Sequence, residues 1–374
     1  MNADFRADIA NMTVLALETS CDETSAAVVR EGTVLSNIVS SQIQLHREYG
    51  GVVPELAARE HLKNLLPVAR AALREAGLTA ADLDAVAATQ GPGLAIALLV
   101  GFKAAQAVAF ALQKPFIGIN HHEAHLYSPW IQGAPGTAPQ PPKSSADATN
   151  VSSDIGRLTA AFADFQPNVS LIVSGGHTLL VLVESELKHR VLGGTIDDAA
   201  GECFDKTGKL MGLPYPAGPI IDRLAEGGDP KAYDFPRPLL HDDNDDFSFS
   251  GLKTSVRYFI RDHPALLDDP RTTRDLCASV QAAIVEVLVK KTLRAARREG
   301  VRCVTASGGV TCNRALRSAL THACKLQGLA LRLADPSLCT DNAAMIGALA
   351  ERKLRDQAAL PPMDDEVKPG WVLA

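Results

Sequence analysis

Two loops of similar composition follow two short apolar runs, and they limit what this chain can fold into more than any other feature. Ser174–Thr178 (Ser-Gly-Gly-His-Thr) follows the run Val169–Val173, and Ser307–Thr311 (Ser-Gly-Gly-Val-Thr) follows Cys303–Ala306. Paired glycines at a strand end let the backbone approach a ligand and turn its N–H groups toward an anion. The repetition favours a chain that holds a phosphate-bearing molecule between two similar halves. A tight turn without a ligand is the alternative for either copy.

The length and the net charge limit the number of domains and the class of function. A chain of 374 residues exceeds one ordinary domain, so two lobes are expected. The net charge of -6 argues against a free-standing nucleic-acid binder, although a local basic face or a basic partner is compatible with it. Seven cysteines without a Cys-x-x-Cys pair argue against a disulfide framework or a zinc–thiolate site, so a reducing cytosol is expected.

Targeting and membrane signals are weak. The polar start, residues 1–11, lacks the apolar core of a signal peptide. Leu94–Leu112 is strongly apolar, but Gly101, Lys103 and Gln106 interrupt it, so we expect a buried core helix and not a membrane span.

Periodicity predicts alternating strands and helices. Thr13–Leu17 and Ala26–Val29 read as a hairpin with a polar, hydroxyl-bearing tip. Residues 55–76 have helical spacing, with Leu56, Leu62, Leu65 and Leu66 expected on one side. The pattern indicates an α/β chain of two lobes around a cleft. The expected lobes are residues 12–130, completed by about 342–360, and residues 161–341, with a flexible Gly/Pro/Ser-rich insert at 131–160.

Two charged segments are expected to be solvated surface. The helix predicted at 271–298 ends in a basic set (Lys290, Lys291, Arg294, Arg297 and Arg298), expected to be a solvated helix end, with a polyanion contact as the alternative. The acidic stretch 241–246 is expected to be a solvated loop.

A candidate metal site follows from histidine spacing. His121 and His125 stand four residues apart, so one helix face could present both to a single ion. Asp341, just before an apolar helix, is the best candidate for a third ligand. Two histidines and a carboxylate suit zinc or ferrous iron and leave coordination positions open. Ordinary surface or core histidines are the alternative.

The same segment does not fit a zinc peptidase. Such a motif needs Glu directly after the first His and a second His three residues after that Glu. Glu123 follows His122, but the closing position holds Leu126. Peptidase chemistry is therefore not supported.

Several motifs together carry a family resemblance. From about Val14 to about Gly347, outside the insert, the chain resembles the TsaD family (also called Gcp or YgjD), the tRNA adenosine threonylcarbamoyltransferases. The motifs are Leu17–Thr24, Gly51–Glu55, His121–His125, Val173–Thr178, Ile196–Glu202, Phe204–Lys206, Phe249–Thr254, Gly308–Val310 with Asn313, and Cys339–Asn342. In two places the chain departs from the family pattern by a small change: Ala124 and Ala217 stand where glycine is usual.

The resemblance implies a fold and a reaction. The fold is the two-lobed actin/Hsp70/sugar-kinase (ASKHA) type with a central ligand cleft. The reaction transfers threonylcarbamoyl from threonylcarbamoyl-AMP to the N6 amine of adenosine 37, next to the anticodon, in tRNAs that read codons starting with A. AMP leaves. The implied partners are tRNA, a paralogous TsaB-like subunit and a TsaE-like ATPase, with the donor made by a TsaC-like synthase, in the cytoplasm and without a membrane.

The resemblance also implies site residues. One iron-like metal (Fe²⁺ or Zn²⁺) is held by His121, His125 and Asp341. The implied donor contacts are Ile172, Val173, Ser174, Gly175, Gly176, Asp205, Gly218, Asp222 and Asn313. Asp205 could accept bonds from ribose hydroxyls, and Lys253 could neutralise phosphate or be an ordinary surface lysine. No side chain is an obvious nucleophile, so direct attack by the tRNA amine fits best.

Three other functions compete with the transferase. An ATP-dependent small-molecule kinase of the same fold would leave the paired histidines unexplained. A metallopeptidase conflicts with the histidine spacing. A non-catalytic partner subunit of the same fold would be expected to lack the histidine pair.

Overall fold

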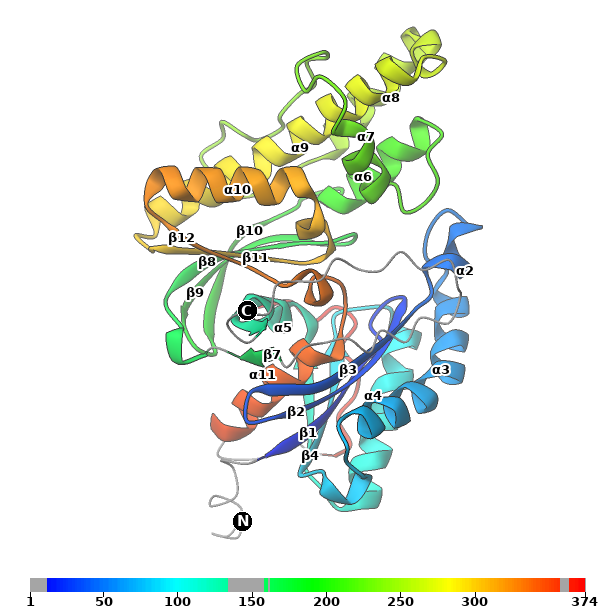
Figure 1. Cartoon of the computed structure of the whole chain (residues 1–374), viewed down its shortest axis with the longest axis vertical. Helices are drawn as coiled ribbons and strands as arrows, with labels where there is room; N and C mark the ends of the chain where they lie inside the picture. Colours follow the sequence, from blue (N-terminus) through cyan, green and yellow to red (C-terminus); the bar gives the residue numbers. More distant parts are fainter. Residues whose placement is uncertain (1–11, 134–157, 161, 357–362, 374) are drawn as a thin grey trace. The chain divides into compact units, whose positions relative to one another are not determined.

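The computed structural model describes residues 12–133, 158–160, 162–356 and 363–373. It divides into two compact units (Figure 1). Unit 1 comprises Met1–Asp164 and Asp341–Leu373, and unit 2 comprises Phe165–Thr340 and Ala374. Most of the expected insert falls on residues 134–157, which lie outside the described residues.

Unit 1 is built on a mixed sheet. Its described residues form seven strands in the order β5-β4-β1-β2-β3-β7-β6. The hairpin expected near the start is confirmed, because β1 and β2 pair antiparallel from Thr13↔Arg30 to Glu18↔Ser25. β4 and β5 add parallel to β1 on the other side. The strands are β1 (Thr13–Glu18), β2 (Glu23–Arg30), β3 (Thr33–Ser41), β4 (Ala85–Gly91), β5 (Phe116–Asn120), β6 (Ile131–Gly133) and β7 (Leu158–Ala160).

Helices cover both faces of this sheet, and the period-2 alternation of the strands decides which side chains meet them. Leu15, Leu17 and Val28 belong to the core cluster under α3 and α4. Ala16 and Val29 face the other way and pack against Gly347 of α11. The helices are α2 (Ile43–Arg47), α3 (Pro54–Glu75), α4 (Ala95–Leu112), α5 (His121–Tyr127) and α11 (Ala343–Asp356).

The helix expected at 55–76 is confirmed as α3, but its buried face differs from the expected one. His61, Leu65, Val68 and Ala72 form the buried stripe, at the 4-3-4 spacing of one helix face. Leu62 and Leu66 lie about 100° away from that stripe and are 70% and 58% exposed. Apolar residues on two faces made the sequence pattern ambiguous.

One described helix, α4, has the length and apolar composition that a membrane span would need. Core helices of soluble proteins pass the same test. Phe102, Ala105 and Ala109 of α4 pack into the core of unit 1, as expected for a core helix.

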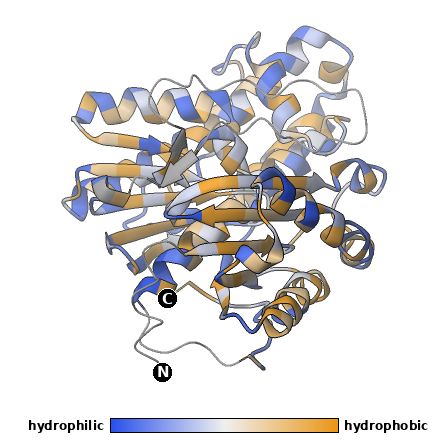
Figure 2. Cartoon of the chain, turned by 60° about the horizontal axis from the view of Figure 1, so that its bottom comes forward, coloured by the Kyte–Doolittle hydropathy of each residue, from blue (hydrophilic) through white to orange (hydrophobic). Residues whose placement is uncertain are grey.

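Unit 2 contains a second mixed sheet. Its described residues form five strands in the order β10-β9-β8-β11-β12, and β8 runs parallel to β11. Figure 2 shows that strands are mostly hydrophobic, whereas helices alternate between hydrophobic and hydrophilic residues. The strands are β8 (Asn168–Val173), β9 (Thr178–Ser185), β10 (Lys188–Gly194), β11 (Cys303–Ser307) and β12 (Ala330–Leu333). The helices are α6 (Ala200–Leu210), α7 (Gly218–Ala225), α8 (Ser250–Asp262), α9 (Pro270–Arg298) and α10 (Arg314–Gln327).

The two charged segments of unit 2 meet at Lys291 and Arg298, so the expectation of a merely solvated segment was wrong for these residues. Lys290, Arg297 and residues 241–244 are exposed, as expected. Lys291 of α9 is fully buried, and its Nζ donates to the backbone oxygen of Asn244 at 3.0 Å. Arg298 forms an ion pair with Asp245, whose side chain is 3% exposed, at 2.5 Å. The acidic loop therefore occupies Lys291 and Arg298, so these two cations are less available to a polyanion.

Candidate functional site

The two candidate histidines come from a strand-to-helix junction. β5 ends at Asn120, whose side-chain oxygen accepts from the backbone N–H of Glu123 at 3.1 Å and so caps α5. The cap fixes the first turn of α5, which begins with His121. His125 follows one turn later on the same face. Both side chains are almost fully buried, at 5% and 1% exposure.

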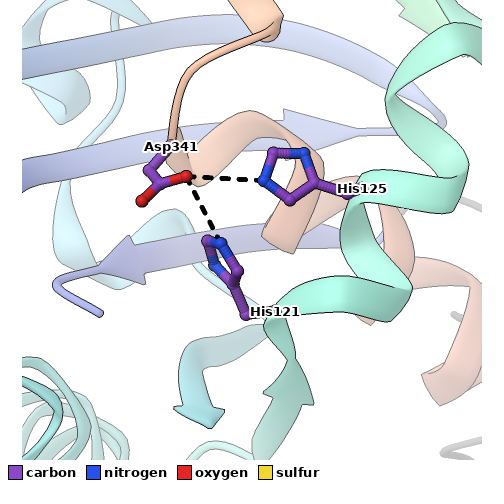
Figure 3. Close-up of side chains that lie close together, drawn as sticks. All are labelled: His121, His125 and Asp341. Carbon is purple, nitrogen blue, oxygen red and sulfur yellow. Dashed lines mark hydrogen bonds and ion pairs between the residues drawn. The ribbon is translucent and has the colours of Figure 1, made fainter. Parts of the chain in front are cut away.

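Asp341 meets both histidines, as Figure 3 shows. Its Oδ1 lies 3.3 Å from His121 Nε2 and 3.4 Å from His125 Nε2. Asp341 precedes α11, so unit 1 alone supplies all three side chains. One ligand atom from each lies within 4.8 Å of the others. The structure therefore brings together all three residues that the sequence proposed as metal ligands.

The spacing of these atoms suits one metal ion. Two ligands bound at 2.0–2.1 Å in a tetrahedral arrangement stand about 3.3 Å apart. The observed separations from Asp341 Oδ1 match that value. Two imidazole nitrogens and one carboxylate oxygen suit zinc or ferrous iron and leave coordination positions for a substrate. The chain thus holds a possible metal-binding group.

The electrostatics of the group follow from burial and mutual pairing. Burial by itself would lower the pKa of His121, but the carboxylates of Asp341 and Glu18 outweigh it and raise that pKa well above its usual value. Burial lowers the pKa of His125. Burial opposes ionisation of Asp341, yet the adjacent imidazole of His121 holds its pKa well below the usual range.

Glu123 has a structural partner. Its carboxylate, 6% exposed, lies 2.6 Å from Nζ of Lys353 on α11. A carboxylate held in a buried ion pair is a poor general base for a peptidase. This pairing agrees with the failed histidine spacing.

The two Ser-Gly-Gly loops lie in the same unit, unit 2. They follow the neighbouring parallel strands β8 and β11, at the same edge of one sheet. Gly308 adopts a φ of +91°, and a Cβ there would stand 2.7 Å from the carbonyl carbon of Val173. At Gly175 and Gly176, by contrast, an added Cβ would have no atom within 4 Å. Glycine is a packing requirement in the second loop only, and open space lies beside the first.

The other proposed donor contacts fall into two groups in unit 2. Asp205 Oδ1 accepts from the backbone N–H of Ala217 at 2.7 Å and of Gly218 at 3.2 Å, at the start of α7. Burial raises the pKa of Asp205. One oxygen of the carboxylate that was expected to receive ribose hydroxyls therefore already has two donors.

The second group joins α7 to the start of α10. Asn313 caps α10 through the backbone N–H of Leu316 at 2.9 Å, and its amide donates to Gln281 at 2.6 Å. Asp222 pairs with Arg314 Nε at 2.9 Å. Sequence reasoning missed Arg314, although its position directly after Asn313 was a usable signal.

Lys253 on α8 is held by an aspartate. Its Nζ lies 2.6 Å from Asp198 Oδ2, and Lys206 binds the other oxygen of Asp198 at 2.8 Å. The Lys253 side chain is 28% exposed. Any contact of Lys253 with phosphate would compete with this pair.

Glu18 is a part of the site that sequence reasoning did not assign. Its carboxylate lies 3.0 Å from His121 Nδ1. The signal was a glutamate directly after the apolar run Val14–Leu17, a position that buries a charge and so calls for a partner.

The comparisons with known proteins follow this geometry. The family model described as TsaD, tRNA N6-adenosine threonylcarbamoyltransferase, matches residues 33–153 and 148–348. A tRNA N6-adenosine threonylcarbamoyltransferase of Geotalea uraniireducens is 47% identical over 97% of this chain and 97% of its own length. A tRNA N6-adenosine threonylcarbamoyltransferase of Pelodictyon phaeoclathratiforme is 50% identical over 92% of this chain and 93% of its own length.

Solved structures support the fold. HypF of T. kodakarensis has a TM-score of 0.56 at 14% identity over 92% of this chain and 49% of that one. A full-length HypF in a phosphate- and nucleotide-bound form has a TM-score of 0.55 at 13% identity, over 94% of this chain and 47% of that one. These likenesses concern the fold alone and confirm the ASKHA-like α/β class. From the family model and from identities of 47% and 50% over nearly the whole chain, this protein belongs to the family of tRNA N6-adenosine threonylcarbamoyltransferases, which are transferases acting on tRNA.

Proposed function

We propose that this chain transfers the threonylcarbamoyl group of threonylcarbamoyl-AMP to the N6 amine of adenosine 37 in tRNAs that read codons starting with A. The observation that carries the proposal is the buried His121, His125 and Asp341 group in a chain of this family. The tRNA amine attacks the carbamoyl carbon, the bond from that carbon to the phosphate oxygen of AMP breaks, the amine loses a proton, and AMP leaves.

The metal-binding group defines the reactive end of this proposal. His121 Nε2, His125 Nε2 and Asp341 would hold one Fe²⁺ or Zn²⁺ ion. When bound, such an ion supplies Lewis-acid polarisation of a carbonyl and charge neutralisation for phosphate or carboxylate oxygens. Burial of both imidazoles keeps competing water away, and the cap on α5 fixes the helix turn from which both histidines project.

The donor contacts are proposed in unit 2. Ile172, Val173 and Ser174 precede the open space beside Gly175 and Gly176, where the backbone can approach a phosphate. Gly218, Asp222 and Asn313 gather around the starts of α7 and α10. We propose that Asp205 acts by holding the start of α7, since its Oδ1 is occupied by backbone donors.

The partners follow from charge and exposed apolar surface. A net charge of -6 repels the tRNA phosphate backbone. We therefore propose that a TsaB-like subunit and a TsaE-like ATPase assist tRNA binding, and that a TsaC-like synthase makes the donor. Leu62 and Leu66 of α3 are exposed, as is Phe110 of α4, at 75%. We propose these exposed apolar side chains as contacts for a protein partner. The proposed location is the cytoplasm, because none of the described cysteines is in a disulfide.

The test is transfer of labelled threonylcarbamoyl from its adenylate to unmodified tRNA, with the partner proteins added. In parallel, the chain is assayed for ATP turnover with small acceptors and for cleavage of a glycoprotein. Transfer without the other two activities is the expected result. ATP turnover with a small acceptor and no transfer in any partner mixture would replace the proposal with the kinase.

A further inference from the structure

We propose that Glu18 is a positioning residue for the metal-binding group: its carboxylate holds the His121 imidazole in the tautomer that carries a proton on Nδ1 and leaves Nε2 free for the ion. This inference rests on the proposed metal site and adds to it a residue that binds no ion itself. It concerns the orientation and the proton of one ligand.

The His121 ring bridges two carboxylates. Glu18 Oε2 lies 3.0 Å from Nδ1, and Asp341 Oδ1 lies 3.3 Å from Nε2. The two nitrogens of an imidazole point in divergent directions, so a group bonded at Nδ1 cannot share an ion bound at Nε2. Glu18 therefore stands on the outer side of the ring, away from the candidate ion.

The direction of the hydrogen bond is set by the other donors to Glu18. The backbone N–H of Ser20 donates to Oε1, and Thr89 Oγ1 donates to Oε2 at 2.6 Å. Both carboxylate oxygens of Glu18 therefore act as hydrogen-bond acceptors. The shared partner at Nδ1 must then supply a proton, so Nδ1–H of His121 donates to Glu18. With Nδ1–H committed to Glu18, Nε2, the atom nearest Asp341, is the nitrogen available to bind an ion.

The fold holds this carboxylate rigidly. Glu18 ends β1, where its side chain is fully buried. Thr89 comes from β4, which pairs parallel with β1. Ser20 also places its Oγ 3.3 Å from His121 Nδ1. A ligand whose outer nitrogen meets a fixed carboxylate loses little rotational freedom on binding an ion, and such outer partners commonly change metal affinity 10–100-fold.

His125 provides an internal contrast. Its Nε2 lies 3.4 Å from Asp341 Oδ1, as in His121. Its Nδ1 is buried and has no hydrogen-bond partner among the described residues. The two histidine ligands are therefore not equivalent, and the built-in orientation belongs to His121.

The experiment measures metal binding by the full chain, without any activity assay. Zn²⁺ and Co²⁺ affinities are obtained by competition with a chelator, and the visible spectrum of the Co²⁺ form reports ligand geometry. Glu18→Gln keeps the shape of the side chain, but its amide cannot accept from all three donors. The expected result is a Kd raised about 10–100-fold and a changed Co²⁺ spectrum.

Two further variants separate positioning from folding. Glu351→Gln makes the same change at another buried glutamate of unit 1, which accepts from Gly32 N at 2.7 Å and touches no ligand. It should bind both metals like the wild type. Thr89→Val leaves the Glu18 carboxylate in place but removes one of its donors, so it should raise the Kd less than Glu18→Gln does. This variant keeps the proposal testable if Glu18→Gln folds poorly.

The outcomes distinguish the two proposals. His121→Ala and Asp341→Ala must each weaken binding more than Glu18→Gln does. If both alanine variants bind like the wild type, the metal site itself is wrong. If both lose binding while Glu18→Gln and Thr89→Val keep the wild-type Kd and Co²⁺ spectrum, the site stands and the positioning role of Glu18 is refuted.

Discussion

Replacing a glycine by alanine should have opposite effects on stability in the two Ser-Gly-Gly loops. Gly308 has φ +91° and ψ 156°, a region that is essentially restricted to glycine and costs other residues about 1–3 kcal/mol. A Cβ there would also stand 2.7 Å from the carbonyl carbon and 3.0 Å from the nitrogen of Val173, well inside the usual 3.5–4.0 Å contact distance. These neighbours are backbone, so β8 or β11 must move.

The magnitude for Gly308→Ala follows from these two costs. Backbone strain of about 1–3 kcal/mol and overpacking of about 1–3 kcal/mol together predict a loss of about 2–6 kcal/mol. Gly176→Ala is the matched control, because an added Cβ meets nothing within 4 Å and its φ is not positive. Its stability should change by less than about 0.5 kcal/mol. If the first loop receives the donor's phosphate, Gly176→Ala should nevertheless weaken donor binding.

The assay must report on unit 2. Both tryptophans, Trp130 and Trp371, lie in unit 1, so intrinsic fluorescence is unsuitable. Hydrogen–deuterium exchange of the peptides that cover β8 and β11, combined with urea unfolding followed by circular dichroism, reports on the affected strands. Equal protection of those peptides in Gly308→Ala and Gly176→Ala would refute the argument from backbone contact.

Two further predictions concern the effect on stability of replacing a charged residue, Asp197 in unit 2 and Lys353 in unit 1. Asp197 accepts from Ser248 Oγ at 2.5 Å and from the N–H of Phe249 at 2.8 Å, and although burial opposes it these bonds lower the pKa of Asp197. Ionised Asp197 therefore stabilises the folded state. This stabilisation is fully present above the unfolded-state pKa near 3.8 and is lost as pH falls through the lower folded-state pKa. Because Asp197 is exposed and screened by solvent, Asp197→Asn should cost less than about 1 kcal/mol in urea unfolding at pH 7 and still less below pH 3. An equal cost at both pH values would contradict this. Lys353→Met leaves Glu123 buried without its cation and should cost about 3 kcal/mol in thermal unfolding, whereas adding Glu123→Gln should recover part of it.

Local motifs made much of this structure predictable. The β1–β2 hairpin, α3 and the helix-capping position of Asn313 follow from alternation, 3.6-residue spacing and capping chemistry that neighbouring residues carry. The His121 and His125 pair also lies within one short segment. Such features depend on interactions close in sequence, where the pattern itself contains the information.

Features that depend on distant partners were missed. Lys291 on α9 looks like a solvated cation until the loop at 241–246 is packed over it, 47 residues away in sequence. Glu18 and His121 are 103 residues apart, and the pairing of β1 with β4 and of β4 with β5 brings them together. Leu62 and Leu66 look like core residues, because a buried stripe and an exposed apolar stripe are indistinguishable by hydrophobicity alone.

The most direct test of the central claim combines metal content with threonylcarbamoyl transfer in the same preparations. Wild type, His125→Ala, Asp341→Ala and the exposed-histidine control His322→Ala are purified, analysed for bound Fe and Zn, and assayed with donor, unmodified tRNA and partner proteins. The account predicts about one ion per chain and full transfer in wild type and His322→Ala, and loss of both in the other two while they remain folded. Full transfer by metal-free, folded Asp341→Ala would contradict it.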